Sequence, residues 1–272
     1  TIPPTDICYF KCQHIINFSK KDDMIYFNNL NNPIVKIDDI YYKYSKNEFQ
    51  SPYRSTIPLI VLFKSDQTLN LEMINTKSNT DIKYTFEYQL HNNQVRSHPS
   101  CTDLMIEYTN GCIAIEAKRT EPPYDTVDKW LSKSPDHRKQ VLDVWLDIIN
   151  TNICPKIDIK KISDLPYQLI HRVAAGCSLN KQHTTIVYIG FDLNVAKTQY
   201  YLDCLTKLSE ILKNKLDFFF YCYKIDKYDE QISLEMKWAL GQRDLTHNVI
   251  EGIKDNKLMK VILAKKYIIN KK

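Results

Sequence analysis

The sequence contains little glycine and few prolines for its length, 5 and 11 of 272 residues respectively. This scarcity argues against collagen-like segments, low-complexity segments and long flexible linkers. No apolar run approaches the ~20 residues that a membrane-spanning helix needs, and the start of the chain does not resemble a signal peptide. We therefore expect a cytoplasmic protein without membrane association, folded as a single domain over residues 1–272.

Several common functional motifs are also missing. The sequence has no Walker loop, no Gly-x-Ser-x-Gly turn and no Gly-x-Gly-x-x-Gly fingerprint. No helix-turn-helix or zinc-finger spacing is recognisable. The eight cysteines are scattered, which is typical of reduced thiols rather than of a disulfide scaffold. Cys8, Cys12 and His14 could begin a zinc site, but no second ligand pair with suitable spacing follows them.

The chain is mildly basic, with 37 Lys and Arg against 32 Asp and Glu and a net charge of +5. This charge is compatible with a polyanionic partner such as nucleic acid. The sequence is also rich in Lys, Asn, Ile and Tyr, a composition that A/T-rich coding sequence tends to produce. The charge alone therefore does not establish such a partner.

Hydrophobic periodicity predicts strands that alternate with helices. Strands are predicted in short pieces within residues 22–40 and at residues 81–90, 103–108, 112–118, 184–191 and 217–225. Helices are predicted within residues 38–64, at residues 124–132, 135–149, 165–179 and 198–214, and at the basic C-terminal end. This order favours an α/β fold with a mixed central β-sheet flanked by helices.

Charged residues interrupt the predicted hairpin at residues 103–118. Its Asn-Gly pair at residues 110–111 is a strong signal for a two-residue turn, which would place Asp103 opposite Lys118. Because side chains alternate along a strand, we expect Asp103, Glu116 and Lys118 on one face of the sheet. Asp103 and Glu116 would then be diagonal neighbours, about 7–8 Å apart.

Two interpretations of these charges are open. One is a surface salt bridge between Asp103 and Lys118, with Glu116 as a bystander, which would contribute about 0–1 kcal/mol. The other is a shared site for a divalent cation, because two adjacent carboxylates disfavour double ionisation unless positive charge compensates. Apolar residues on the same face would shield these charges from solvent, which favours the second interpretation.

Asp103 and the triplet Glu116-Ala117-Lys118 resemble the motif of the PD-(D/E)XK nucleases, the restriction-endonuclease-like superfamily. The resemblance covers about residues 48–190. It implies a restriction-endonuclease-like catalytic core at about residues 38–225, with N- and C-terminal elaborations. The sequence departs from the family pattern at Thr102, where proline often stands.

The resemblance implies a metal-dependent nuclease that hydrolyses phosphodiester bonds, with DNA as the expected substrate. Asp103, Glu116 and the backbone carbonyl of Ala117 would bind Mg²⁺, for which Mn²⁺ can substitute, because such ions prefer hard oxygen ligands. Lys118 would hold the attacking water and stabilise the transition state. Glu48 would add an acidic group from the first helix. The alternative is a catalytically inactive nuclease-fold protein that binds nucleic acid or takes part in an assembly.

Further polar residues could contact the nucleic acid. They are Arg54, Ser55, Arg119, Gln168 and Arg172. Ser55 could instead cap a helix. Gln168, His171 and Arg172 share one helical face by their spacing, which indicates either substrate positioning or a polar stripe on a surface helix. His171 has no positioned partner in the sequence, so we assign it no role as a base.

Alternatives remain for several of these roles. Glu72 and Glu87 compete with Glu48 as the additional acidic residue. Tyr124 and Trp130 could stack on bases or pack within the core. Many members of the superfamily cut two strands as dimers, so a homodimer or a larger complex is compatible with the resemblance.

Overall fold

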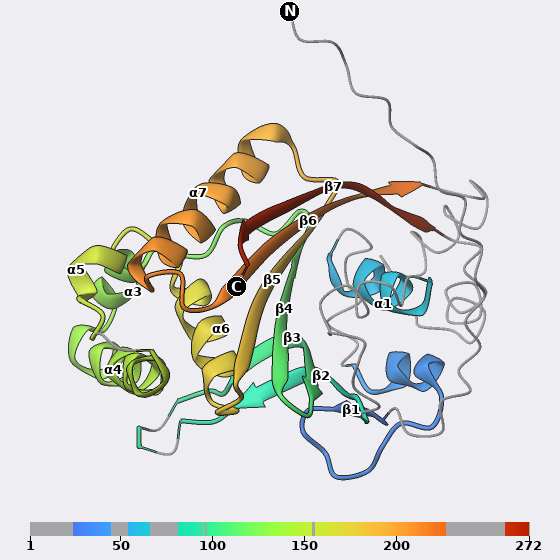
Figure 1. The fold of residues 1–272 in the computed structure, drawn as a ribbon, viewed down its shortest axis with the longest axis horizontal. Coiled ribbons are helices and arrows are strands. Elements are labelled where there is room, and N and C mark those ends of the chain that lie inside the picture. Colours follow the sequence, from blue (N-terminus) through green and yellow to red (C-terminus); the bar gives the residue numbers. More distant parts are fainter. Residues whose placement is uncertain are drawn as a thin grey trace, which may run out of the picture.

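The computed structural model describes residues 24–44, 54–65, 81–92, 94–95, 97–153, 156–226 and 259–271. Within these ranges, seven strands form one mixed sheet whose spatial order follows the sequence (Figure 1). The strands are β1 (Met24–Phe27), β2 (Lys83–Leu90), β3 (Ser100–Tyr108), β4 (Gly111–Lys118), β5 (His183–Phe191), β6 (Asp217–Asp226) and β7 (Lys260–Asn270). The predicted α/β class with a mixed central sheet is therefore confirmed.

The direction of each strand follows from its connections. β2, β3 and β4 form an antiparallel meander, whereas β4, β5 and β6 run parallel to one another. Parallel neighbours need a crossover connection, and helices provide it between β4 and β5 and between β5 and β6. β1 is parallel to β2, and β7 is antiparallel to β6 at the far edge.

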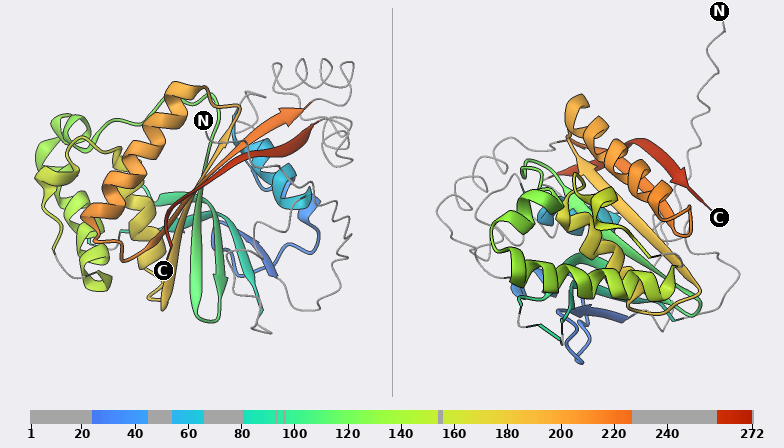
Figure 2. Two further views of the ribbon diagram at one scale, coloured as in Figure 1. Left: turned by 45° about the horizontal axis from the view of Figure 1, so that its top comes forward. Right: turned by 90° about the vertical axis from the view of Figure 1, so that its left-hand side faces the viewer.

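Helices cover both faces of the sheet, as Figures 1 and 2 show. One face carries α3 (Val127–Ser132), α4 (Pro135–Asn152), α5 (Ile159–Ile162), α6 (Tyr167–Cys177) and α7 (Val195–Ile211). The other face carries the 3-10 helix η1 (Ile37–Tyr42) and α1 (Thr56–Ser65). None of the helices in the described ranges combines the length and apolarity needed to cross a bilayer.

The side chains of β3 and β4 alternate between two apolar layers. Leu104 and Ile113 belong to the layer beneath α1, and Met105 and Ala114 belong to the layer beneath α6. Every residue of β4 is buried, which explains why its sequence is almost continuously apolar. A charged residue in β4 therefore needs a partner within the protein.

The hairpin turn lies one residue earlier than predicted. Tyr108 pairs with Gly111, so the turn consists of residues 109–110. Gly111 lies within β4, where an added Cβ would stand 2.2 Å from Tyr108 Oη. The glycine therefore accommodates the close approach of this ring, which would have to move if residue 111 carried a Cβ. Each cross-strand partner moves by two residues, which leaves every side chain on its predicted face.

The C-terminal end was predicted to be helical, and this prediction is wrong. Residues 260–270 form β7, which pairs with β6 through two register irregularities. The segment contains β-branched and aromatic residues between its lysines, and such residues favour a strand that can pair with a partner. Lysines on an edge strand also discourage pairing with other chains.

The cysteines of the described ranges carry free thiols, and they are Cys101, Cys112, Cys177, Cys204 and Cys222. Three of the five are buried, where thiols pack as small apolar groups. Cys8, Cys12 and His14, which could begin a zinc site but have no second ligand pair in the sequence, lie outside the described residues.

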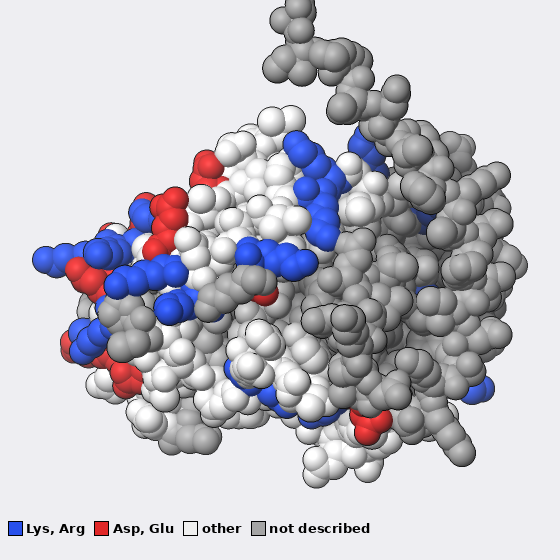
Figure 3. Space-filling view, viewed as in Figure 1, with Lys and Arg blue, Asp and Glu red and all other residues white. Residues whose placement is uncertain are grey.

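The basic residues do not form a continuous surface on the face shown in Figure 3. Basic and acidic side chains intermingle over the helical layer at the left of that view. Exposed ion pairs of this layer include Lys207 with Asp164 and Lys139 with Asp143. The positive net charge therefore does not by itself define a nucleic-acid surface on this face.

A glycine allows α6 to lie close to the sheet. A Cβ on Gly176 would stand 2.8 Å from Thr184 Cγ2 and 3.3 Å from Ile186 Cδ1. We expect Gly176→Ala to lower the free energy of unfolding by about 1–3 kcal/mol through overpacking, although this change in a helix ordinarily adds up to about 1 kcal/mol. Urea unfolding followed by circular dichroism measures the effect.

The double variant Gly176→Ala, Thr184→Ser provides the matched control. Serine lacks the methyl group but keeps the hydroxyl that accepts the weak hydrogen bond of the Cys112 thiol. The double variant should recover most of the lost stability. An unchanged stability in the single variant would contradict the proposed crowding.

Candidate active site

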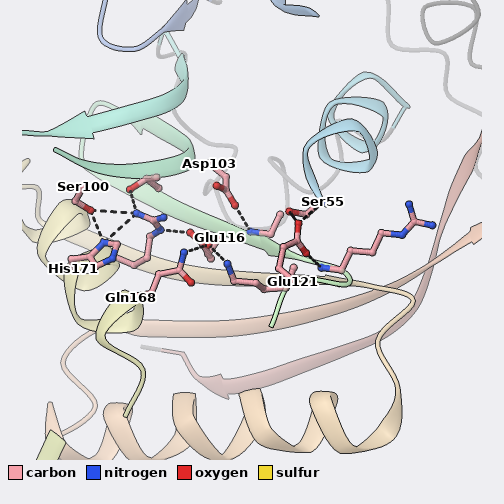
Figure 4. Close-up of polar contacts among 12 residues, drawn as sticks. Ser55, Ser100, Asp103, Glu116, Glu121, Gln168 and His171 are labelled. Atoms are coloured by element: carbon pink, nitrogen blue, oxygen red, sulfur yellow. Dashed lines mark hydrogen bonds and ion pairs between the residues drawn. The ribbon is translucent and has the colours of Figure 1, made fainter. Parts of the chain in front are cut away.

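Glu116 lies at the centre of a buried polar cluster between β4 and α6 (Figure 4). Lys118 Nζ donates a hydrogen bond to Glu116 Oε1 at 2.5 Å, and Gln168 Nε2 donates to the same oxygen at 2.6 Å. Arg172 Nε donates to Oε2. The side chain of Glu116 is only 2% exposed, so these three donors replace the water that its charge would otherwise attract.

Local structure explains why these residues meet. Glu116 and Lys118 are two positions apart on β4, so they project from the same face of the sheet. Gln168 and Arg172 are four positions apart on α6, so they lie on one side of that helix. Both are buried, so the alternative of a polar stripe on a surface helix is wrong.

The interpretation of these charges as a surface salt bridge between Asp103 and Lys118 is also wrong. Lys118 pairs with Glu116, and the two side chains are 7% and 2% exposed. Removing one partner of such a buried pair typically costs about 3–5 kcal/mol, because the other charge is left without compensation. The cluster is therefore a buried network of ion pairs rather than a surface feature.

Asp103 approaches the cluster from β3. Its Oδ2 accepts a hydrogen bond of 2.7 Å from the backbone N–H of Ala117. The observed ladder pairs Leu104 with Ile115, so its continuation brings Asp103 opposite Glu116 rather than diagonal to it. Among the described residues, no hydrogen-bond donor reaches Asp103 Oδ1.

Burial and charge set opposite pKa shifts for the two carboxyl groups. Burial, followed by the charge of Glu116, raises the pKa of Asp103 to about 7 against the opposing effects of Arg172 and Lys118. Burial would also raise the pKa of Glu116, but Arg172 and Lys118 outweigh it and lower that pKa. Burial disfavours the charged form of Lys118, yet Glu116 and Asp103 raise its pKa above the ordinary value. The two carboxyl groups therefore differ: Glu116 is ionised, whereas Asp103 is readily protonated.

These residues line a cavity of about 520 Å³ that we call the carboxylate cavity. Its walls include Asp103, Glu116, Ala117, Lys118, Gln168 and Arg172, together with Arg54 and Ser55 from the N-terminal side of α1. Arg119, the remaining predicted nucleic-acid contact, does not line it. The guanidinium of Arg119 lies 3.5 Å from Asp192 instead.

Glu121 is a functional candidate that the sequence did not reveal. Its Oε1 accepts hydrogen bonds from Ser55 N–H and Ser55 Oγ, at 2.8 and 3.1 Å, and its Oε2 accepts one from Arg119 N–H at 2.7 Å. Glu121 thereby joins the start of α1 to the end of β4 (Figure 4). Glu121 and Ser55 are 66 residues apart, and no sequence signal pairs them.

Glu87, a competitor of Glu48 for the role of additional acidic residue, lies beside the cavity. It lines the carboxylate cavity and has a φ of 50°. The ladder between β2 and β3 omits the pair that Glu87 would form with Asp103. Strain of this kind in a non-glycine residue often occurs at functional sites. Glu48 and Glu72, the other two candidates, lie outside the described residues.

Thr102, where the sequence departs from the nuclease motif that it resembles, contacts Arg172 in the structure. Arg172 Nη1 lies 3.4 Å from both Thr102 Oγ1 and Ser100 Oγ. Arg172 therefore contacts hydroxyl groups of β3 while its Nε holds Glu116 of β4. A proline in place of Thr102 would remove one of these hydroxyl acceptors.

The oxygen atoms of this site suit a hard divalent cation. Each carboxylate group offers about four lone-pair positions. The hydrogen bonds described above do not occupy Asp103 Oδ1 or one position on Glu116 Oε2, so these remain for a metal ion. Burial and, after it, the charge of Glu116 raise the pKa of Asp103, and a bound cation would favour its ionised form. Among the described residues, no group of three or more His, Cys, Asp or Glu is arranged to hold an ion. Two carboxylates would therefore need backbone or water ligands as well.

The fold and the site together define an α/β protein with a buried carboxylate, amine and guanidinium cluster at the edge of a cavity. Residues 33–242 match the model of a family described as a domain of unknown function, DUF6946. The match covers well over half of the chain, so the protein belongs to this family. No curated protein and no solved structure matches the chain.

The raised pKa of Asp103 predicts a pH-dependent effect on stability. The folded protein keeps the Asp103 proton up to about pH 7, whereas the unfolded chain releases it near 3.8. Ionisation of Asp103 therefore lowers stability as pH rises through this window. As pH rises from about 4 to about 8, the free energy of unfolding of Asp103→Asn should increase by on the order of 1–4 kcal/mol relative to that of the original protein. Urea unfolding at a series of pH values measures this difference.

Asp164→Asn is the control for this experiment. Asp164 is exposed, and its hydrogen bond with Lys207 lowers its pKa. Its ionisation therefore stabilises the folded protein, so the variant should show a small change of opposite sign. If the difference in the free energy of unfolding between Asp103→Asn and the original protein stays constant with pH, the pKa of Asp103 is not raised by folding, which contradicts the prediction.

Proposed function

We propose that this protein is a metal-dependent nuclease that hydrolyses phosphodiester bonds in DNA, with a restriction-endonuclease-like core. The observation that supports it is the meeting of Asp103, Glu116 and Lys118 at the wall of one cavity. These are the residues on which the resemblance to the PD-(D/E)XK nucleases rests. Their chemistry also suits the reaction, because phosphodiester hydrolysis creates negative charge that cations must stabilise.

Asp103 and Glu116 would hold Mg²⁺ or Mn²⁺, with Ala117 beside them in the cavity wall. When bound, such an ion polarises the phosphate and lowers the pKa of a water molecule. Asp103 contributes an oxygen that the described residues leave uncommitted, and the Ala117 N–H fixes its other oxygen. The carboxylate is thus oriented before any ligand arrives.

Lys118 and Arg172 would perform different tasks. An ammonium group has three N–H donors, and Lys118 gives one of them to Glu116. Because Lys118 lines the cavity, the others can hold the attacking water and the charged phosphate oxygens. Arg172 is bound to Glu116 and keeps it ionised. Arg172 is therefore a positioning residue for Glu116.

A second candidate function is supported by the hydrogen bonding of Glu116. Three donors from Lys118, Gln168 and Arg172 already satisfy most of its acceptor capacity. A cluster that is neutralised in this way can stabilise the fold without a metal. The corresponding function is that of a catalytically inactive nucleic-acid-binding or assembly protein.

Cleavage assays test the first proposal. We expect cleavage of plasmid, linear duplex or single-stranded DNA with Mg²⁺ or Mn²⁺, and none with EDTA. Asp103→Asn and Lys118→Ala should each lower the cleavage rate by at least about 10²-fold, because each removes charge at the reacting phosphate. RNA is included as a substrate to test the assignment to DNA.

Lys139→Ala serves as the control for Lys118→Ala. Lys139 pairs with Asp143 on the surface of α4, so its removal should leave the cleavage rate unchanged. Circular dichroism and thermal unfolding establish that each variant is folded. Undiminished, metal-dependent cleavage by folded Lys118→Ala and Asp103→Asn would refute the proposed mechanism.

Metal binding distinguishes the two candidate functions. A ligand that binds the folded state raises its stability by an amount that grows with the ligand concentration. For a nuclease, we expect Mg²⁺ or Mn²⁺ to raise the Tm of the original protein and to raise that of Asp103→Asn far less. An unchanged Tm together with retained DNA binding would favour the inactive protein.

A further inference from the structure

A second cavity, of about 890 Å³, lies next to the carboxylate cavity. The two share Cys101, Tyr124, Gln168 and Arg172 in their walls. Sites for small molecules commonly measure about 300–1,000 Å³, so the second cavity has room for a nucleotide. A ligand held there would lie beside any phosphate bound at the carboxylates.

The two cavities differ in chemistry. The carboxylate cavity has Asp and Glu in its walls, whereas none of the described residues that line the second cavity is acidic. Instead, the second cavity combines aromatic rings with histidines and arginines. Aromatic faces stack on nucleobases, and cationic side chains attract phosphate. The second cavity therefore suits one nucleotide better than an acidic or a purely apolar ligand.

The aromatic wall is held in place by its own contacts. The rings of Trp130 and Tyr167 stack at 3.6 Å with an interplanar angle of 8°. Trp145 Nε1 donates a hydrogen bond of 2.8 Å to Tyr167 Oη, and the guanidinium of Arg138 lies 5.0 Å from the Trp130 ring. A wall fixed in this way loses little entropy when a ligand binds.

Tyr124 provides an accessible ring at the boundary of the two cavities. It is 52% exposed, and its ring centroid is 5.1 Å from Lys118 Nζ. Pro122 and Pro123 precede it, and their fixed φ angles restrict the backbone that carries the ring. Tyr124 can therefore offer a face to a base while Lys118 contacts the adjacent phosphate.

His171 supplies a hydrogen-bond donor to the same cavity. Its Nδ1 lies 2.5 Å from Ser100 Oγ and 3.4 Å from Arg172 Nη1. A guanidinium can only donate, so we assign Nδ1 as the acceptor and place the proton of the neutral ring on Nε2. Burial, with Arg172 and Lys118, lowers the pKa of His171 well below its usual range, which keeps the ring neutral.

We propose that the second cavity takes an unpaired base of the strand that the nuclease cleaves, with Tyr124 stacking on that base. The inference rests on the proposed function and specifies its substrate class. In an intact duplex each base is stacked and paired, and extracting one breaks both interactions. The preferred substrate is therefore single-stranded DNA, or DNA with unpaired nucleotides, rather than intact duplex.

Binding measured in EDTA tests this proposal without cleavage. Fluorescence anisotropy compares a labelled single strand, the blunt duplex of the same sequence and a strand of abasic nucleotides. We expect the normal single strand to bind about ten-fold more tightly than either of the others, because only its bases are free to stack on an aromatic ring. Equal affinity for all three would overturn the proposal.

Substitutions at Tyr124 locate the effect. Tyr124→Ala should weaken binding of the single strand about ten-fold and leave binding of the duplex unchanged, and Tyr124→Phe should retain the affinity. Tyr42→Ala is the matched control, because Tyr42 is similarly exposed at 53% and lies in η1, on the other face of the sheet. Equal losses in Tyr124→Ala and Tyr42→Ala would contradict a specific stacking role.

Two further arms separate the possible outcomes. A 2-aminopurine base in the single strand should be quenched on binding, and less so with Tyr124→Ala. Competition by a free mononucleotide as effective as that of the strand would overturn the assignment to a nucleic-acid strand. Cleavage without a preference for unpaired bases would refute this inference and leave the nuclease proposal intact. Selective binding of the single strand, without cleavage in the presence of any metal, would refute the nuclease proposal and leave the base-binding cavity supported.

Discussion

The buried charge of Glu116 is the constraint on which the site depends. Moving a carboxylate out of water costs several kcal/mol unless hydrogen bonds and opposite charge replace its hydration. Lys118 comes from the same strand, but Gln168 and Arg172 come from α6. α6 must therefore dock against β4 before the charge is compensated. The close approach at Gly176 permits this docking, so packing and electrostatics require the same arrangement.

Part of this arrangement could be predicted from the sequence because the strand period is simple. Alternation along β3 and β4 placed Asp103, Glu116 and Lys118 on one face, and an error of two residues in cross-strand pairing does not alter that result. The register itself was wrong because an Asn-Gly pair is normally a turn signal. Here Tyr108 lies across Gly111 instead, a contact between side chain and backbone that no pattern of residue types indicates.

Other features depend on contacts between distant parts of the chain. Gln168 and Arg172 are 52 and 56 residues from Glu116, and their shared helical face showed only that they would act together. Glu121 and Ser55 had no signal at all, since their hydrogen bonds form only after α1 and β4 are in place. β7 was mistaken for a helix because its lysines obscured the β-branched residues between them, and pairing with β6 decides its structure.

The protonation of Asp103 controls the charge balance of the whole cluster. With Asp103 protonated, the two cationic groups of Lys118 and Arg172 face a single anion, Glu116, and the cluster has a surplus positive charge. With Asp103 ionised, the charges balance. An anionic ligand therefore favours uptake of the proton, and a cationic ligand favours its release. Anions and metal ions that reach this cavity select opposite protonation states of one carboxyl group, near neutral pH.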